Sequence, residues 1–164
     1  MSAIIRAWQK LTTNLAQAPY WPLAMLARFS LAALFWRSGQ TKVTGFAVDP
    51  LAGLWQWGWP HLNDAATYLF AEEYRLPFLS PEPAAIISAM AEHVLALMLL
   101  LGMGSRIAAA GLLVMTAVIE IFVYPDAYPT HGIWATALLM LIFRGPGWLS
   151  IDHWLAKRLG YQAA

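Results

Sequence analysis

The sequence contains an apolar run, PAAIISAMAEHVLALMLLLG at residues 83–102, that is long enough to cross a lipid bilayer as one helix. A helix that spans a membrane needs about 20 predominantly apolar residues, because each residue advances the helix by only about 1.5 Å. A second run, RIAAAGLLVMTAVIEIFVY at residues 106–124, follows after a turn that contains Gly102 and Gly104. The two runs predict a hairpin of membrane-spanning helices.

Two further apolar runs extend this hairpin to a bundle. PLAMLARFSLAALFWRSG begins at Pro22, and the shortest run, HGIWATALLMLIF, begins at His131. The predicted spans are about residues 22–40, 83–103, 106–124 and 131–148. The predicted fold class is therefore all-α: an integral membrane four-helix bundle that forms a single domain over residues 1–164.

The composition excludes several classes of protein. Apolar residues make up 60% of the chain and charged residues only 12%, whereas a soluble domain carries about 25% charged residues. A formal net charge of +1 argues against a nucleic-acid partner, which would require clustered Lys and Arg. The chain has no cysteine, which excludes disulfides, thiolate nucleophiles and iron–sulfur ligation within it.

The segments before the first span and after the last one also show helical patterns. Within residues 3–18, apolar side chains recur at helical spacing, which predicts an interfacial helix lying on the membrane before the first span. Near the C-terminus, Ser150 can cap a second short interfacial helix, and Gly160 can end it. We expect these two helices to flank the bundle at both ends of the chain.

An outer segment rich in tryptophan connects the first two spans at residues 42–82. Three of its tryptophans lie close together in the sequence: Trp55, Trp57 and Trp59. Asn63 or Asp64 can cap a helix that extends to Arg75. Tryptophan concentrates at membrane interfaces, so the segment is expected to rest on the lipid headgroups, either as a lid on the bundle or as an ordinary interfacial anchor.

The distribution of basic residues predicts the orientation, because cytoplasmic connections are enriched in Lys and Arg. One side of the predicted bundle collects six of them: Arg6, Lys10, Arg106, Arg144, Lys157 and Arg158. The other side has Arg37, Lys42 and Arg75, which are diluted by acidic residues. We therefore expect a multi-pass protein of the bacterial inner membrane with both termini in the cytoplasm.

Polar side chains within the spans are the candidate functional residues, because a charge inside a bilayer is costly and usually faces the bundle interior. The candidates for ligand binding or proton relay are Arg37, Glu92, His93, Glu120, Tyr124 and His131. All fall between the middle of the membrane and its outer surface, which predicts one polar cavity there. Glu92 is expected within a short, water-bridged distance of Arg37, Glu120 or His131, and Arg37 would balance its charge. Two carboxylates in one cavity would raise each other's pKa, whereas Arg37 or Lys42 would lower the pKa of both.

The chemistry of this set leaves alternatives open. Glu92, His93, Glu120 and His131 are weak candidates for a metal site, since the Glu-x-x-His spacing of di-iron bundles does not occur. A quinone site needs an apolar slot with one or two hydrogen-bonding groups, which the same residues could provide. Each candidate also has a structural explanation: Arg37 and Tyr124 can anchor helix ends, and a bundle histidine is commonly satisfied by neighbours.

Several stretches resemble the DoxX family of small four-helix bacterial membrane proteins over about residues 22–155. The matching pieces are LARFSLAALFWRSGQTKVTGF at 26–46, FAEEYRLPFLSPEPAA at 70–85, AEHVLALMLLLGMGSRIAA at 91–109, MTAVIEIFVYPDAYPTHGIWA at 115–135 and RGPGWLSIDH at 144–153. The family's recurring acidic residue in the second helix matches Glu92, and its basic residues after the first helix match Arg37 and Lys42. Similar sequences often carry glutamine at the position of Glu120, which implies that a second carboxylate is not essential.

The resemblance implies a link to redox or stress chemistry. One branch of the family reduces quinone while it oxidises thiosulfate, and other members accompany redox maturation, oxidative-stress or metal-stress proteins. We therefore expect an inner-membrane accessory protein of a redox or stress-response system, with a protein partner from the same pathway and a periplasmic pocket for a quinone or another small ligand. No cofactor signature is present, which leaves catalysis by this chain alone open.

The alternative hypothesis is a non-enzymatic membrane partner or a transporter that handles small solutes or metal. Four short helices leave little room for alternating access unless the protein forms an oligomer. Quinone and metal analysis of the purified protein would separate the two hypotheses.

Overall fold

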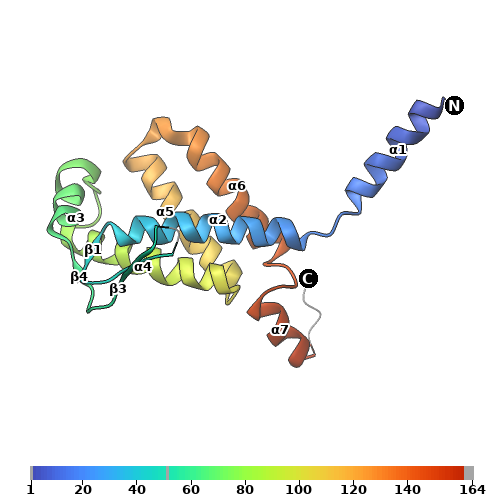
Figure 1. The fold of residues 1–164 in the computed structure, drawn as a ribbon. Coiled ribbons are helices and arrows are strands. Elements are labelled where there is room, and N and C mark those ends of the chain that lie inside the picture. Colours follow the sequence, from blue (N-terminus) through green and yellow to red (C-terminus); the bar gives the residue numbers. More distant parts are fainter. Residues whose placement is uncertain (1, 51, 161–164) are drawn as a thin grey trace.

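The computed structural model describes residues 2–50 and 52–160, and most of these residues are helical (Figure 1). The elements are α1 (Ala3–Ala16), α2 (Trp21–Gln40), β1 (Val43–Thr44), β2 (Ala47–Asp49), β3 (Leu54–Gln56), β4 (His61–Leu62), α3 (Asp64–Leu69), the π-helical turn η1 (Phe70–Tyr74), α4 (Pro81–Leu101), α5 (Ser105–Phe122), the 3-10 turn η2 (Pro125–Ala127), α6 (Tyr128–Arg144) and α7 (Ile151–Arg158).

Helices α2, α4, α5 and α6 pack against one another: α4 contacts α2 and α5, and α6 contacts α5 and α2. Their shared core consists of fully buried aliphatic and aromatic side chains, among them Leu31, Phe35, Leu99, Leu112, Leu138 and Leu141. By length and composition, α4 and α5 can each cross a membrane, with mean hydropathies of 2.1 and 1.8. Among the described helices, these two alone meet that test.

The ends of the predicted spans agree with the observed helices except at the fourth. Gly102 and Gly104 have φ angles of +69° and +57°, left-handed values that glycine adopts without strain, and they form the turn between α4 and α5. The span predicted at 131–148 is wrong at both ends, since α6 runs from Tyr128 to Arg144. Pro129 lies in its first turn rather than before it, and Gly145 ends it.

The prediction of an all-α chain is incomplete, because the outer segment contains two small antiparallel pairings. Val43 pairs with Leu62 in the β1–β4 ladder, and Val48 pairs with Trp55 in the β2–β3 ladder. The backbones approach closely between the two ladders: a Cβ atom added to Gly58 would lie 2.3 Å from the carbonyl oxygen of Gly45. Glycine is therefore required for this crossing.

The helix predicted after Asn63 or Asp64 is confirmed. The Asn63 side chain accepts a hydrogen bond from the backbone N–H of Ala65 and caps α3. The helix continues through η1 and ends at Arg75, whose φ angle of 42° is left-handed. This α3–η1 unit belongs to the outer segment and contacts α4, and it lies at the N-terminal end of that helix (Figure 1).

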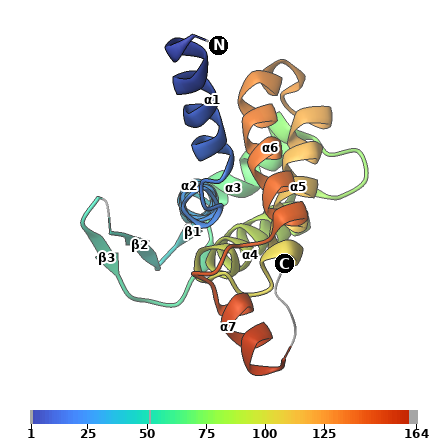
Figure 2. The same ribbon diagram turned by 90° about the vertical axis from the view of Figure 1, so that its right-hand side faces the viewer.

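Both terminal helices are present. All side chains of α1 are exposed, and α1 stands apart from the other helices in Figures 1 and 2. The hydroxyl of Ser150 accepts a hydrogen bond from the N–H of His153 and caps α7. The start of α2, the α4–α5 turn and α7 lie at one end of the bundle, opposite the end that carries α3 and the strands (Figure 1).

Two charged side chains, the buried Arg28 and the partly exposed Asp152, close the end of the bundle near α7. The guanidinium of Arg28 donates to the carbonyl oxygens of Leu99, Leu100 and Leu149 at 2.8, 2.6 and 2.8 Å. The carboxylate of Asp152 accepts from the backbone N–H groups of Gly104 and Ser105, at the start of α5. We call these contacts the Arg28–Asp152 clasp. It joins α2 and α7 to the α4–α5 turn.

Candidate functional site

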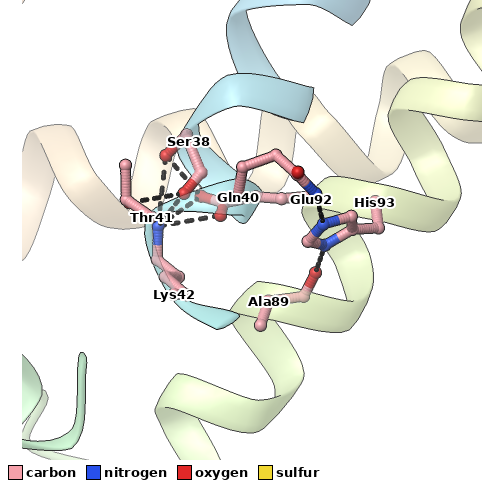
Figure 3. Close-up of polar contacts among 7 residues, drawn as sticks. All are labelled: Ser38, Gln40, Thr41, Lys42, Ala89, Glu92 and His93. Atoms are coloured by element: carbon pink, nitrogen blue, oxygen red, sulfur yellow. Dashed lines mark hydrogen bonds and ion pairs between the residues drawn. The ribbon is translucent and has the colours of Figure 1, made fainter. Parts of the chain in front are cut away.

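The most buried charged contact in the bundle is an ion pair between Lys42 and Glu92 (Figure 3). The Lys42 Nζ lies 2.8 Å from Glu92 Oε2 and 3.0 Å from Oε1. Ser38 Oγ donates to Glu92 Oε1 at 3.0 Å, and Lys42 Nζ lies 3.1 Å from the same hydroxyl oxygen. Only 4% of Lys42 and 2% of Glu92 are exposed, so both charges depend on these protein contacts.

The positions of the two side chains follow from the ends of their elements. Lys42 comes directly after the C-terminal cap of α2 at Thr41, where the free carbonyl groups of a helix favour a cation. Its Nζ also donates to the carbonyl oxygen of Ser38 at 3.3 Å. Glu92 lies in the middle of α4 and faces α2, the helix that α4 contacts along its length.

The expected partners of Glu92 are wrong. Arg37 instead forms an ion pair with Asp49 at 3.0 Å, and 63% of its side chain is exposed. Glu120 and His131 bind to each other rather than to Glu92. Lys42 therefore fills the charge-balancing role that the sequence analysis assigned to Arg37.

A cavity of about 190 Å³ adjoins Glu92 between α4, α5 and the α3–η1 unit. Its polar lining comes from Ser38, Ser88, Glu92 and Tyr74, and the rest of its wall is aliphatic or aromatic. Phe70 and Phe78 contribute rings from the outer segment, while Val114 and Val118 come from α5. We call this the Glu92 cavity. It combines a mostly apolar wall with a few convergent polar groups, as ligand sites commonly do.

Tyr74, which lines this cavity, contacts a second tyrosine that is bound to a carboxylate. The rings of Tyr74 and Tyr124 meet edge to face with centroids 5.9 Å apart, and the Tyr124 hydroxyl donates to Glu73. Burial, together with the nearby carboxylate of Glu92, raises the pKa of Tyr74. The hydrogen bond to Glu73 raises the pKa of Tyr124 well above its usual value. Both phenols are therefore held in the neutral form, as hydrogen-bond donors.

His93 lies next to Glu92 in the sequence but faces a different space. Its Nδ1 is 2.7 Å from the carbonyl oxygen of Ala89, and its Nε2 is 2.6 Å from the amide nitrogen of Gln40 (Figure 3). The ring lines a separate cavity of about 460 Å³ with Trp36 and Phe46. Both ring nitrogens thus have protein partners, which fits the structural explanation for His93.

Glu120 and His131 form a third, separate group. His131 Nδ1 lies 2.6 Å from Glu120 Oε2, and the two residues line a groove between α5 and α6. The predicted single cavity is therefore divided into three sites, at Glu92, at His93 and at Glu120–His131. In the part of the chain that the structure describes, no three His, Asp or Glu side chains gather in a geometry that would hold a metal ion.

Comparison with known families gives one match. The sequence model of the DoxX family matches residues 23–125, which include α2, the outer segment, α4 and α5. Lys42, Glu92 and Tyr74 all lie within the matched region, whereas His131 lies beyond it. No curated protein and no solved structure matches the chain.

Proposed function

Because this chain belongs to the DoxX family of membrane proteins, we propose that it is an inner-membrane accessory protein of a redox or stress-response system that binds a quinone head group in the Glu92 cavity. The supporting observation is the buried Lys42–Glu92 ion pair at the wall of an apolar cavity with aromatic lining. A quinone ring would contact the aromatic and aliphatic wall, and its oxygens would meet polar groups at the edge of the cavity.

The residues of the cavity have distinct roles in this proposal. The neutral hydroxyl of Tyr74 would donate a hydrogen bond to a quinone oxygen. Glu92 would accept or relay the proton that accompanies quinone chemistry, and Lys42 would balance the charge when the carboxylate is ionised. Electrons would come from a protein partner in the same pathway.

The proposed topology has four membrane spans, α2, α4, α5 and α6, within one domain, with both termini in the cytoplasm. The arrangement of the bundle supports it: the start of α2 and helix α7 lie at the same end, and α3 and the strands lie at the other (Figure 1). The cavity would then face the periplasmic half of the bilayer. The exposed apolar side chains of α1, including Ile4, Trp8 and Leu15, are suited to the cytoplasmic membrane surface.

Quinone extraction from the purified protein tests the ligand. Protein in mild detergent would be extracted with organic solvent, and quinone per chain would be measured by chromatography for the wild type, Glu92→Gln and Tyr74→Phe. We expect near-stoichiometric quinone in the wild type and a loss of most of it in both variants. Glu82→Gln is the matched control, because Glu82 is an exposed carboxylate in the first turn of the same helix.

The same preparation distinguishes the alternative role in solute or metal handling. Metal content would be measured by mass spectrometry on the extracted samples. The proposal is contradicted if the wild type holds no more quinone than its copurified lipid would carry over. It is also contradicted if Glu92→Gln retains as much quinone as the wild type. Stoichiometric metal without quinone would favour a metal-handling protein instead.

A further inference from the structure

A groove of about 340 Å³ lies between α5 and α6, on a face of the bundle away from the Glu92 cavity. Helix α5 contributes Leu113, Thr116, Ala117, Glu120 and Ile121, and α6 contributes Tyr128, His131, Gly132 and Ala135. No residue lines both this groove and the Glu92 cavity. The groove is almost entirely apolar except where the Glu120–His131 pair meets it.

Gly132 keeps the floor of this groove open. It lies inside α6 with an ordinary helical backbone, and a Cβ atom added there would meet no atom within 4 Å. Neither backbone conformation nor close packing therefore requires glycine at this position. Glycine in a helix interior costs roughly 1 kcal/mol relative to alanine, and the missing side chain here preserves space above the helix.

His131 presents a ring nitrogen without a partner to this space. The residue is 7% exposed, and its Nδ1 bonds to the carboxylate of Glu120 at 2.6 Å. Trp134 packs against the ring with centroids 4.8 Å apart and fixes its plane. Within residues 2–50 and 52–160, no hydrogen bond reaches His131 Nε2. Glu120 binds the proton-bearing Nδ1, so Nε2 carries no proton when the ring is neutral and can then accept a hydrogen bond.

From this geometry we infer that the α5–α6 groove is a second binding site, for a lipid-soluble molecule that donates a hydroxyl hydrogen bond to His131 Nε2. The apolar walls take the body of the ligand, and the open floor at Gly132 gives it room. An accessible acceptor that borders an apolar groove favours a ligand with a donor, because a polar group left unpaired beneath an apolar ligand is costly. Glu120 acts as a positioning residue that sets the tautomer of His131.

The test uses a matched pair of probes, 4-octylphenol and its methyl ether 4-octylanisole, which differ in the hydroxyl donor. The full chain would be labelled with ¹⁵N-histidine and studied by NMR in detergent micelles. It has four histidines, and the signals of His131 would be identified by their absence in His131→Gln. We expect the phenol to shift the Nε2 signal of His131, and the ether to bind at least about tenfold more weakly.

Two variants separate this site from a general effect of the probes. Gly132→Leu fills the groove and should abolish the shift while it leaves the His131 signals of the free protein unchanged. Ile133→Ala, at an exposed position next to it on α6, should bind the phenol normally. Glu92→Gln should also bind normally, so failure of the quinone proposal leaves this inference standing.

Three outcomes would overturn the inference. They are equal responses to the phenol and the ether, a shift that survives Gly132→Leu, or no response of His131 at phenol concentrations that saturate the micelle.

Discussion

Lys42 Nζ lies 2.8 Å from Glu92 Oε2, in a place where both side chains are almost completely shielded from solvent. Taking two charges out of water costs several kcal/mol per ion, and their attraction often only balances that cost. Well-packed apolar side chains of similar volume in place of the two charges would stabilise the folded protein as well or better. The Lys42–Glu92 pair is therefore better explained by a role in the adjoining Glu92 cavity than by a contribution to the stability of the fold.

Removal of Lys42 alone should destabilise the protein strongly. Lys42→Met leaves the carboxylate of Glu92 buried without a cation, for which we expect a loss of about 3–5 kcal/mol. Glu92→Gln should cost less, since the amide oxygen can still accept from Lys42 and Ser38. The double variant Lys42→Met/Glu92→Gln should recover most of the loss, because it leaves no buried charge without a partner. Reversible unfolding in detergent gives the free energy of unfolding of each variant. If the losses in the two single variants simply added up in the double variant, the coupling between Lys42 and Glu92 would be contradicted.

Arg28→Lys should weaken the end of the bundle near α7. The guanidinium reaches carbonyl groups on α4 and beyond α6 at the same time, and a single ammonium group cannot satisfy all of them. We expect a loss of about 2–4 kcal/mol, based on charged hydrogen bonds worth about 1.5–3 kcal/mol each. Arg37→Lys is the control, because the Arg37 side chain is 63% exposed, and this replacement should change stability by about 1 kcal/mol or less.

Tyr124 should ionise unusually late. Its hydrogen bond to Glu73 raises the pKa of the phenol in the folded protein, so its contribution to stability is present below about pH 10, the value of a free tyrosine. That contribution is lost as the pH rises further. An absorbance titration of the phenolates should lose one late-ionising group in Tyr124→Phe. Tyr128→Phe, at an exposed site, is the control, and identical titration curves for the two variants would refute the prediction.

The absence of cysteine makes the topology directly testable. Single cysteines would be placed at Lys10 on α1, at Ala52 in the outer segment and at Lys157 on α7. In intact cells, a membrane-impermeant maleimide should label the variant at Ala52 and spare the other two until the cells are lysed. Labelling of Lys157→Cys before lysis would show that the C-terminal helix faces the periplasm.

Features governed by local sequence were predictable. The glycine turn at Gly102 and Gly104, the cap at Ser150 and the cap at Asn63 all depend on a few neighbouring residues, and the structure confirms them. The short strands were not predictable, because two- and three-residue ladders such as Val43 with Leu62 carry no periodicity.

The partners within the site were harder to predict than its residues. Lys42 follows the cap of α2, where helical spacing no longer tells which way a side chain points, so Arg37 was an equally reasonable partner for Glu92. Glu120 and His131 lie on adjacent helices joined by a short connection, and their direct contact removes both from the Glu92 cavity. Polar side chains within apolar spans identified the candidate residues. Which of these residues contact each other depends on how the helices pack, and the sequence alone does not show that packing.

The Arg28–Asp152 clasp has a consequence for biosynthesis. Arg28 is translated early, but two of its acceptors, Pro146 and Leu149, and the capping carboxylate of Asp152 are translated after α2, α4, α5 and α6. Until this last part of the chain leaves the ribosomal exit tunnel, the first amide groups of α5 lack their cap and the guanidinium lacks half of its acceptors. The helices can enter the membrane one after another, but the order in which the ribosome delivers them makes the locking of the bundle a late event.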